Sequence, residues 1–170
     1  MQNKRGISQA FARPAAELVI RPATVFDVFA ISQVLIASIR DLCQADHGGD
    51  AGKIADWTAN KSPAQIRNWI DGPGRYWLAE RGGEPEAVGG LAPEGLISLL
   101  YVFPGAVGQG SGSVMLRHLE MELCGAGHSE GRLNATRTAQ GFYRTRGWQS
   151  DDAPQEGCGT PCIPMRKSLL

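Results

Sequence analysis

The 170-residue sequence lacks an excess of charge of either sign, because 17 basic and 17 acidic side chains give a formal net charge of zero. Binding to a nucleic-acid backbone or to an anionic membrane surface usually needs a positive field, which this composition does not supply. No apolar run approaches the ~18–20 residues of a membrane span. The N-terminal residues also lack the unbroken apolar segment of a secretory signal. The sequence therefore predicts a cytoplasmic protein with no nucleic-acid partner and no membrane partner.

Cysteine is scarce for a chain of this length, and the sequence holds only Cys43, Cys124, Cys158 and Cys162. Four scattered cysteines do not form the dense framework of a disulfide-rich secreted domain, so we expect reduced thiols. The three-residue gap before Cys162 has no second cluster of ligands, and it favours a turn over a zinc site. His118 and His128 also lack ligand spacing, and we interpret them as surface residues. No metal site is predicted.

What the sequence does have is enough length for one core. A chain of 170 residues, 42% of them hydrophobic, fits one compact α/β domain and is short for two. Residues 1–16 show no hydrophobic period and include Gly6 and Pro14. We therefore predict a disordered tail over residues 1–16 and a single domain over residues 17–170.

Hydrophobic periodicity predicts several helices. Apolar residues recur at helical spacing over residues 24–44, and Thr24 followed by Asp27 resembles a capping box at the start of that helix. A second helix is expected to begin after Ser62, with Pro63 in its first position. Further helices are expected around Trp57, after the glycine-rich segment near residue 110, and around residues 139–147.

Alternating or continuous apolar runs bounded by Gly and Pro predict the strands. The expected strands span residues 18–20, 75–80, 86–91, 96–103, 132–136 and 163–167. The run over residues 96–103 is nearly all apolar, so we expect a central strand that is buried on both faces of the sheet.

The segment from Gly105 to Ser113 joins this apolar strand to a helix and has glycines at positions 108, 110 and 112. Glycines let the backbone approach a ligand closely, and a helix N-terminus adds a partial positive charge. This arrangement predicts a site for a phosphate or pyrophosphate. It lacks the Lys-Ser/Thr of a Walker A loop, the spacing of a dinucleotide fingerprint and the flanking glycines of a nucleophile elbow. A plain glycine-rich connection is the alternative.

Two segments about thirty residues apart resemble, in the right order, the two signatures of the GCN5-related N-acetyltransferase (GNAT) family. The first, similar to the acetyl-CoA motif, comprises Leu100-Tyr101-Val102, Pro104, Gly108-Gln109-Gly110-Ser111-Gly112-Ser113 and Leu116. The second, similar to a strand followed by A-x-x-F-Y-x-x-x-G-aromatic, comprises Asn134-Ala135-Thr136, Ala139, Phe142-Tyr143 and Gly147-Trp148. Together with the opening Ile20-Arg21-Pro22-Ala23, the resemblance covers roughly residues 18–167.

The resemblance implies a mixed α/β (α+β) fold, with a mostly antiparallel sheet that is flanked by helices and splayed between its fourth and fifth strands. The cofactor, acetyl-CoA, would lie in that gap. The implied cofactor-binding residues are Leu100, Tyr101, Val102, Val107, Gly108, Gln109, Gly110, Ser111, Gly112, Ser113 and Thr136. Val107 departs from the family pattern, which usually has Arg or Gln there, so one contact on the pyrophosphate side is missing.

The resemblance also implies the chemistry, which is transfer of an acetyl group from acetyl-CoA to a primary amine of a small molecule or peptide. Tyr143 would be the general acid for the leaving thiolate, and a packed aromatic role beside Phe142 is the alternative. A backbone N–H near Tyr101 or Val102 would polarise the thioester carbonyl. The acidic residue that the family commonly places at the start of the fourth strand is absent, because Leu96-Ile97 occupies that stretch.

The general base is therefore not assigned by a motif, and Glu80, Glu94 and His47 are candidates that more often prove to be surface residues. An amine with a lowered pKa would need no strong base. The acceptor is left open among polyamines, amino acids, antibiotics, peptide N-termini and protein lysines. A non-catalytic acyl-CoA-binding or regulatory module is the alternative function, and a homodimer is compatible with the sequence.

Overall fold

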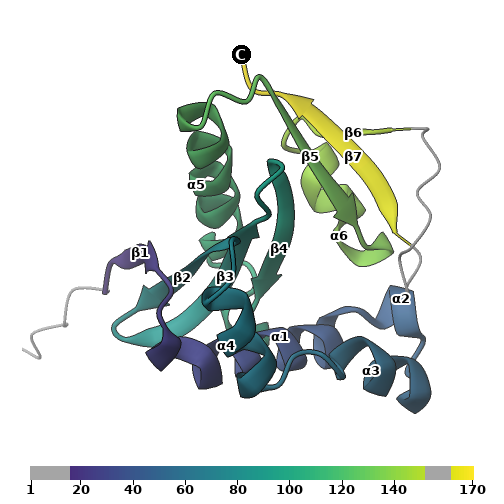
Figure 1. The fold of residues 1–170 in the computed structure, drawn as a ribbon. Helices are drawn as coiled ribbons and strands as arrows, with labels where there is room; N and C mark the ends of the chain where they lie inside the picture. Colours follow the sequence, from purple (N-terminus) through teal and green to yellow (C-terminus); the bar gives the residue numbers. More distant parts are fainter. Residues whose placement is uncertain (1–15, 152–161) are drawn as a thin grey trace, which may run out of the picture.

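The computed structural model describes residues 16–151 and 162–170, so the predicted tail over residues 1–16 lies outside the described part except for Ala16. A seven-stranded sheet of order β1-β2-β3-β4-β5-β7-β6 organises the chain (Figure 1). All neighbouring strands pair antiparallel except β4 and β5, which are parallel. The strands are β1 (Leu18–Pro22), β2 (Arg75–Arg81), β3 (Glu84–Leu91), β4 (Leu96–Val102), β5 (Glu130–Ala135), β6 (Gln149–Ser150) and β7 (Ile163–Ser168). The predicted fold class is confirmed.

Helices cover both faces of the sheet. The α-helices are α1 (Val28–Leu42), α2 (Gln44–His47), α3 (Ala51–Thr58), α4 (Pro63–Ile70), α5 (Ser111–Gly125) and α6 (Arg137–Arg144). Two short 3-10 turns, η1 (Val25–Asp27) and η2 (Pro104–Ala106), precede α1 and the glycine turn. In Figure 1, α1, α3 and α4 lie together at one side of the sheet, and α5 lies at the other.

The alternation of side chains along β2 separates the two hydrophobic cores. Leu78 points to the core that α1 and α4 share, where it packs with Ile31 and Ile66. Trp77 and Ala79 point to the opposite core, which α5 and α6 cover. Because successive side chains of a strand face opposite ways, one apolar strand supports both layers.

The helix starts follow the predicted capping chemistry. Thr24 and Asp27 form a complete capping box, and Ser62 accepts a hydrogen bond from the backbone N–H of Gln65, with Pro63 in the first turn. The single helix expected over residues 24–44 is divided into η1, α1 and α2. The break between α1 and α2 falls at Cys43, where the backbone leaves helical geometry. The structure confirms both predicted helix starts, but the sequence did not reveal the break at Cys43.

The sheet opens between β4 and β5, as predicted. The two strands pair only at Leu96 with Arg132 and at Ile97 with Leu133, whereas β3 pairs with β4 as far as Val102. Figure 1 shows β4 and β5 running in the same direction and diverging. The expectation that β4 is buried on both faces is wrong, since only Ile97 of this strand is buried. The physical reason is that the rest of the strand borders the gap.

The structure contradicts one expectation from composition, which is that all cysteines are reduced. Cys43 and Cys124 are free, but Cys162 is disulfide-bonded, so the expectation of reduced thiols is wrong at that position. One disulfide needs no dense cysteine framework, which is why composition did not reveal it. The turn expected around Cys158 lies outside the described residues.

Among the described residues, no helix is long and apolar enough to cross a membrane, and no cluster of His, Cys, Asp or Glu is placed to hold a metal ion.

Candidate active site

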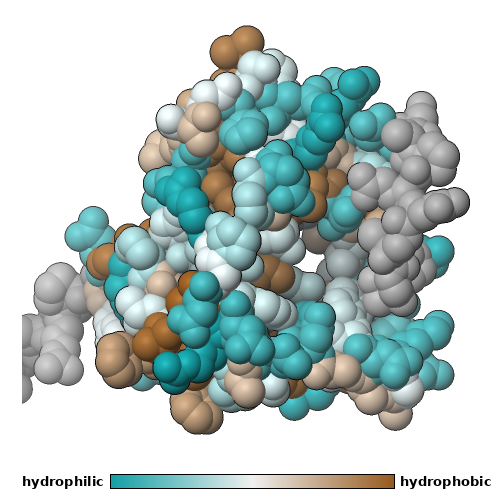
Figure 2. Space-filling view, viewed as in Figure 1, coloured by the Kyte–Doolittle hydropathy of each residue, from teal (hydrophilic) through white to brown (hydrophobic). Residues whose placement is uncertain are grey.

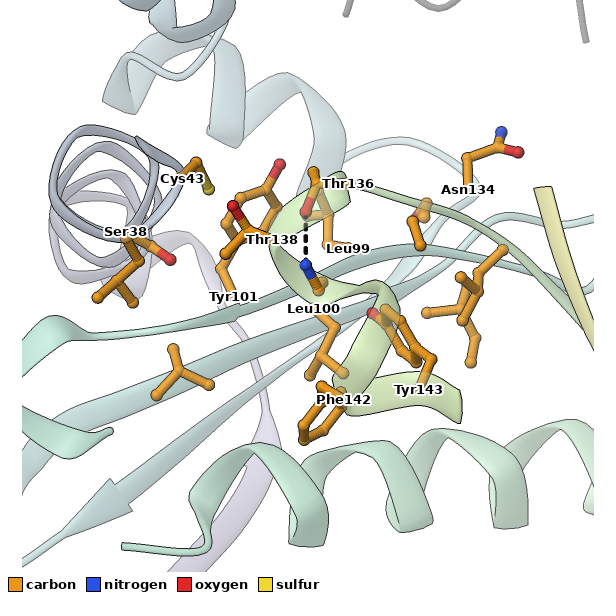
Figure 3. A pocket seen from close by; sticks show the side chains of 17 residues that line it. Ser38, Cys43, Leu99, Leu100, Tyr101, Asn134, Thr136, Thr138, Phe142 and Tyr143 are labelled. Atoms are coloured by element: carbon orange, nitrogen blue, oxygen red, sulfur yellow. Dashed lines mark hydrogen bonds between the residues drawn. The ribbon is translucent and has the colours of Figure 1, made fainter. Parts of the chain in front are cut away.

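A cavity of about 230 Å³ lies where β4 and β5 diverge. One wall is β4, the opposite wall is the end of β5 with the start of α6, and the C-terminal end of α1 closes one side (Figure 3). The space-filling view is hollowed between the region of α1 and α3 and the region of β5 and α6 (Figure 2). The polar side chains around the cavity are Ser38, Cys43, Ser98, Tyr101, Asn134, Thr136, Thr138 and Tyr143. No charged side chain of the described residues lines it.

Tyr143 reaches this cavity from α6 and is only 6% exposed. Its ring packs edge-on against Phe142 and Trp148, at centroid distances of 5.2 and 5.9 Å. Burial raises the pKa of the hydroxyl well above its usual value, and the nearby Tyr101 raises it further. The phenol is therefore protonated at neutral pH. The two interpretations of Tyr143 are therefore compatible, because its ring packs against aromatic neighbours while the residue also lines the cavity.

Tyr101 brings a second phenol to the cavity, from β4. Burial raises its pKa to about 12, while a hydrogen bond with the Trp57 side chain acts in the opposite direction. The sequence analysis named Tyr101 as a cofactor-binding residue and for its backbone N–H, and it did not consider the hydroxyl. The inward orientation could not be inferred from the sequence, because β4 was expected to be buried on both faces.

Asn134 is a further functional candidate, which the sequence analysis named only as part of the second signature and not as a site residue. It lies on β5 and lines the cavity, and its Oδ1 atom is buried without a hydrogen-bond partner among the described residues. An acceptor left unpaired in a buried place costs free energy. A ligand with an N–H or O–H group at this position would remove that cost.

The glycine turn before α5 takes the backbone shape that the sequence suggested. Gly108 and Gly110 have φ angles of 81° and 87°, in the left-handed region that favours glycine. Gln109 closes the turn by donating from Nε2 to the carbonyl oxygen of Gly105 at 2.8 Å. Gly112 is constrained by packing instead, since a Cβ there would lie 3.0 Å from a methyl group of Val102, which would have to shift.

A second cavity of about 450 Å³ lies over this turn. It is lined by Val102, Ala106, Val107, Gly108, Gly110, Gly112, Ser113, Phe142 and Arg146. Val102 and Phe142 line both cavities, so the two spaces adjoin. The turn presents the N-terminal end of α5 to the second cavity, and such an end attracts anions.

The structure distributes the predicted cofactor-binding residues over the two cavities. Leu100, Tyr101, Val102 and Thr136 line the first, and Val107, Gly108, Gly110, Gly112 and Ser113 line the second. Two predicted residues line neither cavity. Gln109 holds the turn, and Ser111 is 1% exposed, with its hydroxyl buried and unpaired among the described residues.

None of the three candidate bases lines the cavity. His47 is buried, and both ring nitrogens are occupied: Nδ1 accepts from the N–H of Gly49, and Nε2 lies 2.9 Å from the carbonyl oxygen of Ile39. Glu80 accepts two hydrogen bonds from Arg21, and Glu94 is exposed in the turn before β4. The expectation that His47 is a surface residue is wrong, because its ring is buried and contacts a backbone carbonyl near the C-terminal end of α1.

His118 was expected to be a surface residue, but its side chain is only 22% exposed. Its ring packs edge-on against Trp77 at 5.1 Å, and Nε2 is buried with no hydrogen-bond partner among the described residues. Burial lowers its pKa. His128 is half-buried beside Gly95. Helical spacing alone did not show that these side chains face packed neighbours.

Residues 43–169 match the sequence model of one protein family, whose description is Acetyltransferase (GNAT) domain. No curated protein matches the chain significantly. Several solved structures share the fold at low sequence identity, so their likeness establishes the architecture and not the substrate.

One of these structures is the "GCN5-related N-acetyltransferase: Aminotransferase, Class-II" of Rhodopseudomonas palustris. It is 22% identical, with a TM-score of 0.80, over 92% of this chain and 99% of that one. The PaiA N-acetyltransferase of Thermoplasma acidophilum, solved with coenzyme A, is 17% identical, with a TM-score of 0.75, over 89% and 99% of the two chains. A GCN5-related N-acetyltransferase of Ralstonia eutropha is 24% identical, with a TM-score of 0.62, over 83% and 98%.

Proposed function

Because the chain belongs to the GNAT acetyltransferase family, we propose that it transfers an acetyl group from acetyl-CoA to a primary amine of a small molecule or peptide. The observation that carries this proposal is the pair of adjoining cavities, one over the glycine turn and one in the gap between β4 and β5. An elongated ligand with phosphates at one end and a thioester at the other suits such a pair.

The residues around the cavities fit the chemistry of acyl-CoA. Gly108 and Gly110 would let the backbone approach the phosphates, and the start of α5 would contribute its partial positive charge. The apolar wall made by Leu100 and Val102 would take the uncharged arm, and the unpaired Oδ1 of Asn134 would accept a hydrogen bond from an amide of that arm or from the amine. Bound acetyl-CoA supplies an activated carbonyl carbon.

In the proposed reaction, the neutral amine nitrogen attacks the thioester carbonyl carbon, the carbon–sulfur bond breaks, and the sulfur takes a proton. The nitrogen loses one proton to solvent as the amide forms, and solvent returns a proton to the group that protonated the sulfur. Tyr143 is the proposed donor of the proton to the sulfur, since burial keeps its hydroxyl protonated. A phenol with a raised pKa is a weak acid toward a thiolate in water. The low-polarity cavity also disfavours a charged thiolate, which makes the sulfur more basic there and so favours its protonation.

The amine must be neutral when it attacks, and no Asp, Glu or His of the described residues lines the first cavity to remove its proton. We therefore propose that the acceptor binds as the free base. An amine with a low pKa is a better substrate on this view. The rate at subsaturating amine should rise with pH up to the pKa of the amine itself.

Thermal unfolding with and without ligand tests the proposal first. Acetyl-CoA at 100 times its dissociation constant adds about 2.7 kcal/mol to the stability, which is a rise of about 5–10 °C for a chain of this size. A panel of amines is then incubated with acetyl-CoA, and free thiol release is followed. A shift with ATP or NAD but none with acetyl-CoA would contradict the proposal. Binding of acetyl-CoA without thiol release for any amine would favour a non-catalytic acyl-CoA-binding module.

A further inference from the structure

The cavity over the glycine turn has a side that the sequence signatures do not describe. Arg146 follows the end of α6 by two residues and lines this cavity together with Gly108 and Gly110. Because α6 also carries Tyr143, one short segment of chain reaches both cavities.

Neighbouring groups hold the Arg146 guanidinium in place. Nε and Nη2 donate to the Ser113 hydroxyl at 3.2 and 2.6 Å, and Nη1 donates to the carbonyl oxygen of Phe142 at 2.8 Å and to the Thr145 hydroxyl at 3.0 Å. The guanidinium carbon also lies 3.8 Å from the centre of the Phe142 ring. A side chain that is already ordered loses little conformational entropy when a ligand binds.

All of these partners are neutral. None of the ion pairs among residues 16–151 and 162–170 includes Arg146, whereas Arg21, Arg75 and Arg81 each have a carboxylate partner. The positive charge of Arg146 is therefore not compensated by an acidic side chain of the described residues, and it faces the cavity.

Arg146 is also the cation that this cavity would otherwise lack. No other Lys or Arg of the described residues lines it, and Val107 occupies the position on the turn where the family usually has Arg or Gln. The Val107 side chain is 56% exposed and offers no hydrogen bond. The hydrogen bonds of Arg146 to its neighbours leave one N–H of the guanidinium unused, on Nη2, and a charged N–H donor is suited to a phosphate oxygen.

We propose that Arg146 binds a phosphate group of acyl-CoA and takes the place of the basic or amide side chain that Val107 does not provide. This inference rests on the proposed function, because it specifies how the same ligand is held. It assigns to the segment after α6 a part of ligand recognition that the glycine turn does not supply.

The test measures dissociation constants by calorimetry for CoA, 3′-dephospho-CoA and pantetheine, which carries no phosphate. Arg146→Gln should weaken CoA binding about 10- to 100-fold, the range for a charge-assisted hydrogen bond, and leave pantetheine binding unchanged. Arg144→Gln is the matched control, since Arg144 is exposed, belongs to the same segment and lines neither cavity. A loss confined to CoA assigns Arg146 to the 3′-phosphate, and a loss shared with dephospho-CoA assigns it to the pyrophosphate.

A second pair of variants guards against a change in folding. Arg146→Lys keeps the charge and should retain more affinity for CoA than Arg146→Gln. Adding Val107→Arg to Arg146→Gln should restore most of the lost affinity, because it returns a cation to the turn. Each variant's melting temperature without ligand is measured alongside.

Two results would overturn the inference, and they differ from failure of the proposed function. Equal CoA affinity in the Arg146→Gln variant, or an equal loss for pantetheine, would show that Arg146 does not bind phosphate while the protein still binds CoA. If the unaltered protein binds neither CoA nor 3′-dephospho-CoA, the proposed function is wrong and the role of Arg146 falls with it.

Discussion

Asp46 accepts a hydrogen bond from the Thr138 hydroxyl at 2.6 Å, although 92 residues separate the two. The same carboxylate accepts from the backbone N–H groups of Arg137 at 2.7 Å and Thr138 at 3.1 Å. Asp46 thus satisfies two of the N–H groups that the first turn of α6 leaves unpaired, and Thr136 caps a third through Ala139. The contact ties α2 to α6 beside the cavity, at the side where β4 and β5 no longer pair.

Replacement of Asp46 should show how much this contact between α2 and α6 stabilises the fold. We expect Asp46→Ala to lower the free energy of unfolding by about 1–3 kcal/mol, because it leaves helix-terminal N–H groups without an acceptor. The control is Asp41→Ala, since Asp41 is exposed and pairs only with its neighbour Arg40. It should change the stability by less than about 0.5 kcal/mol. Urea unfolding gives both values, and equal effects of the two substitutions would contradict the prediction.

The pH dependence of stability should report on Asp27. The Arg21 guanidinium, which donates to Asp27 at 2.8 and 2.9 Å, lowers the pKa of this carboxyl to about 2, and hydrogen bonds from Thr24 add to the effect. The folded-state pKa lies below the unfolded value, so the stabilisation is complete above about pH 4 and is lost as the pH falls toward about 2. Its size is about 2 kcal/mol at neutral pH.

Asp27→Asn removes the group and should therefore be less stable than the unaltered protein at pH 7, with a difference that shrinks below about pH 4. Chemical unfolding at several pH values measures this difference. Glu94→Gln, which replaces an exposed carboxylate in a turn, serves as the control and should show a small and constant difference. A difference between Asp27→Asn and the unaltered protein that does not change with pH would contradict the assigned ion pair.

The two phenols of the cavity can be distinguished by removing one hydroxyl at a time. Tyr143→Phe should lower the transfer rate by about 10²–10⁴, the usual range for general acid catalysis, with little change in CoA affinity. Tyr101→Phe should have the smaller effect, since Tyr101 is not the proposed proton donor. Tyr76→Phe, on β2 and away from both cavities, should leave the rate unchanged. Full turnover in the Tyr143→Phe variant would remove Tyr143 from the mechanism and leave the proton donor unidentified.

The glycines of the turn should respond differently from a glycine in the following helix. Gly110→Ala should lower the free energy of unfolding by about 1–2 kcal/mol, because an L-residue at a φ of 87° is strained. Acetyl-CoA binding should weaken as well. Gly125→Ala, in the last turn of α5 with open space around its Cβ position, should leave the stability unchanged or raise it slightly. The prediction fails if Gly110→Ala folds and binds acetyl-CoA as well as Gly125→Ala does.

The sequence by itself determined the local features of this protein. Thr24 with Asp27, and Ser62 with Pro63, mark helix starts, because a capping side chain acts within three residues of its partner. The glycine turn before α5 was likewise readable, since a left-handed backbone at Gly108 and Gly110 excludes most other residues. The family signatures predicted the opening of the sheet between β4 and β5, for which local chemistry has no signal.

Only the tertiary structure decided which polar side chains are buried, paired or free. The sequence predicts surface positions for His47 and His118, but packing buries the His47 ring, and the His118 ring packs against Trp77 and is only partly exposed. Three features depend on elements that lie 30 or more residues apart and meet around the gap. They are the hydrogen bonds of Asp46 to α6, the unpaired Oδ1 of Asn134 and the charge of Arg146, which has no acidic partner among the described residues. Periodicity along the chain reports which face of a helix or strand is apolar. It cannot report which distant element covers that face, and the pKa and reactivity of a side chain depend on that cover.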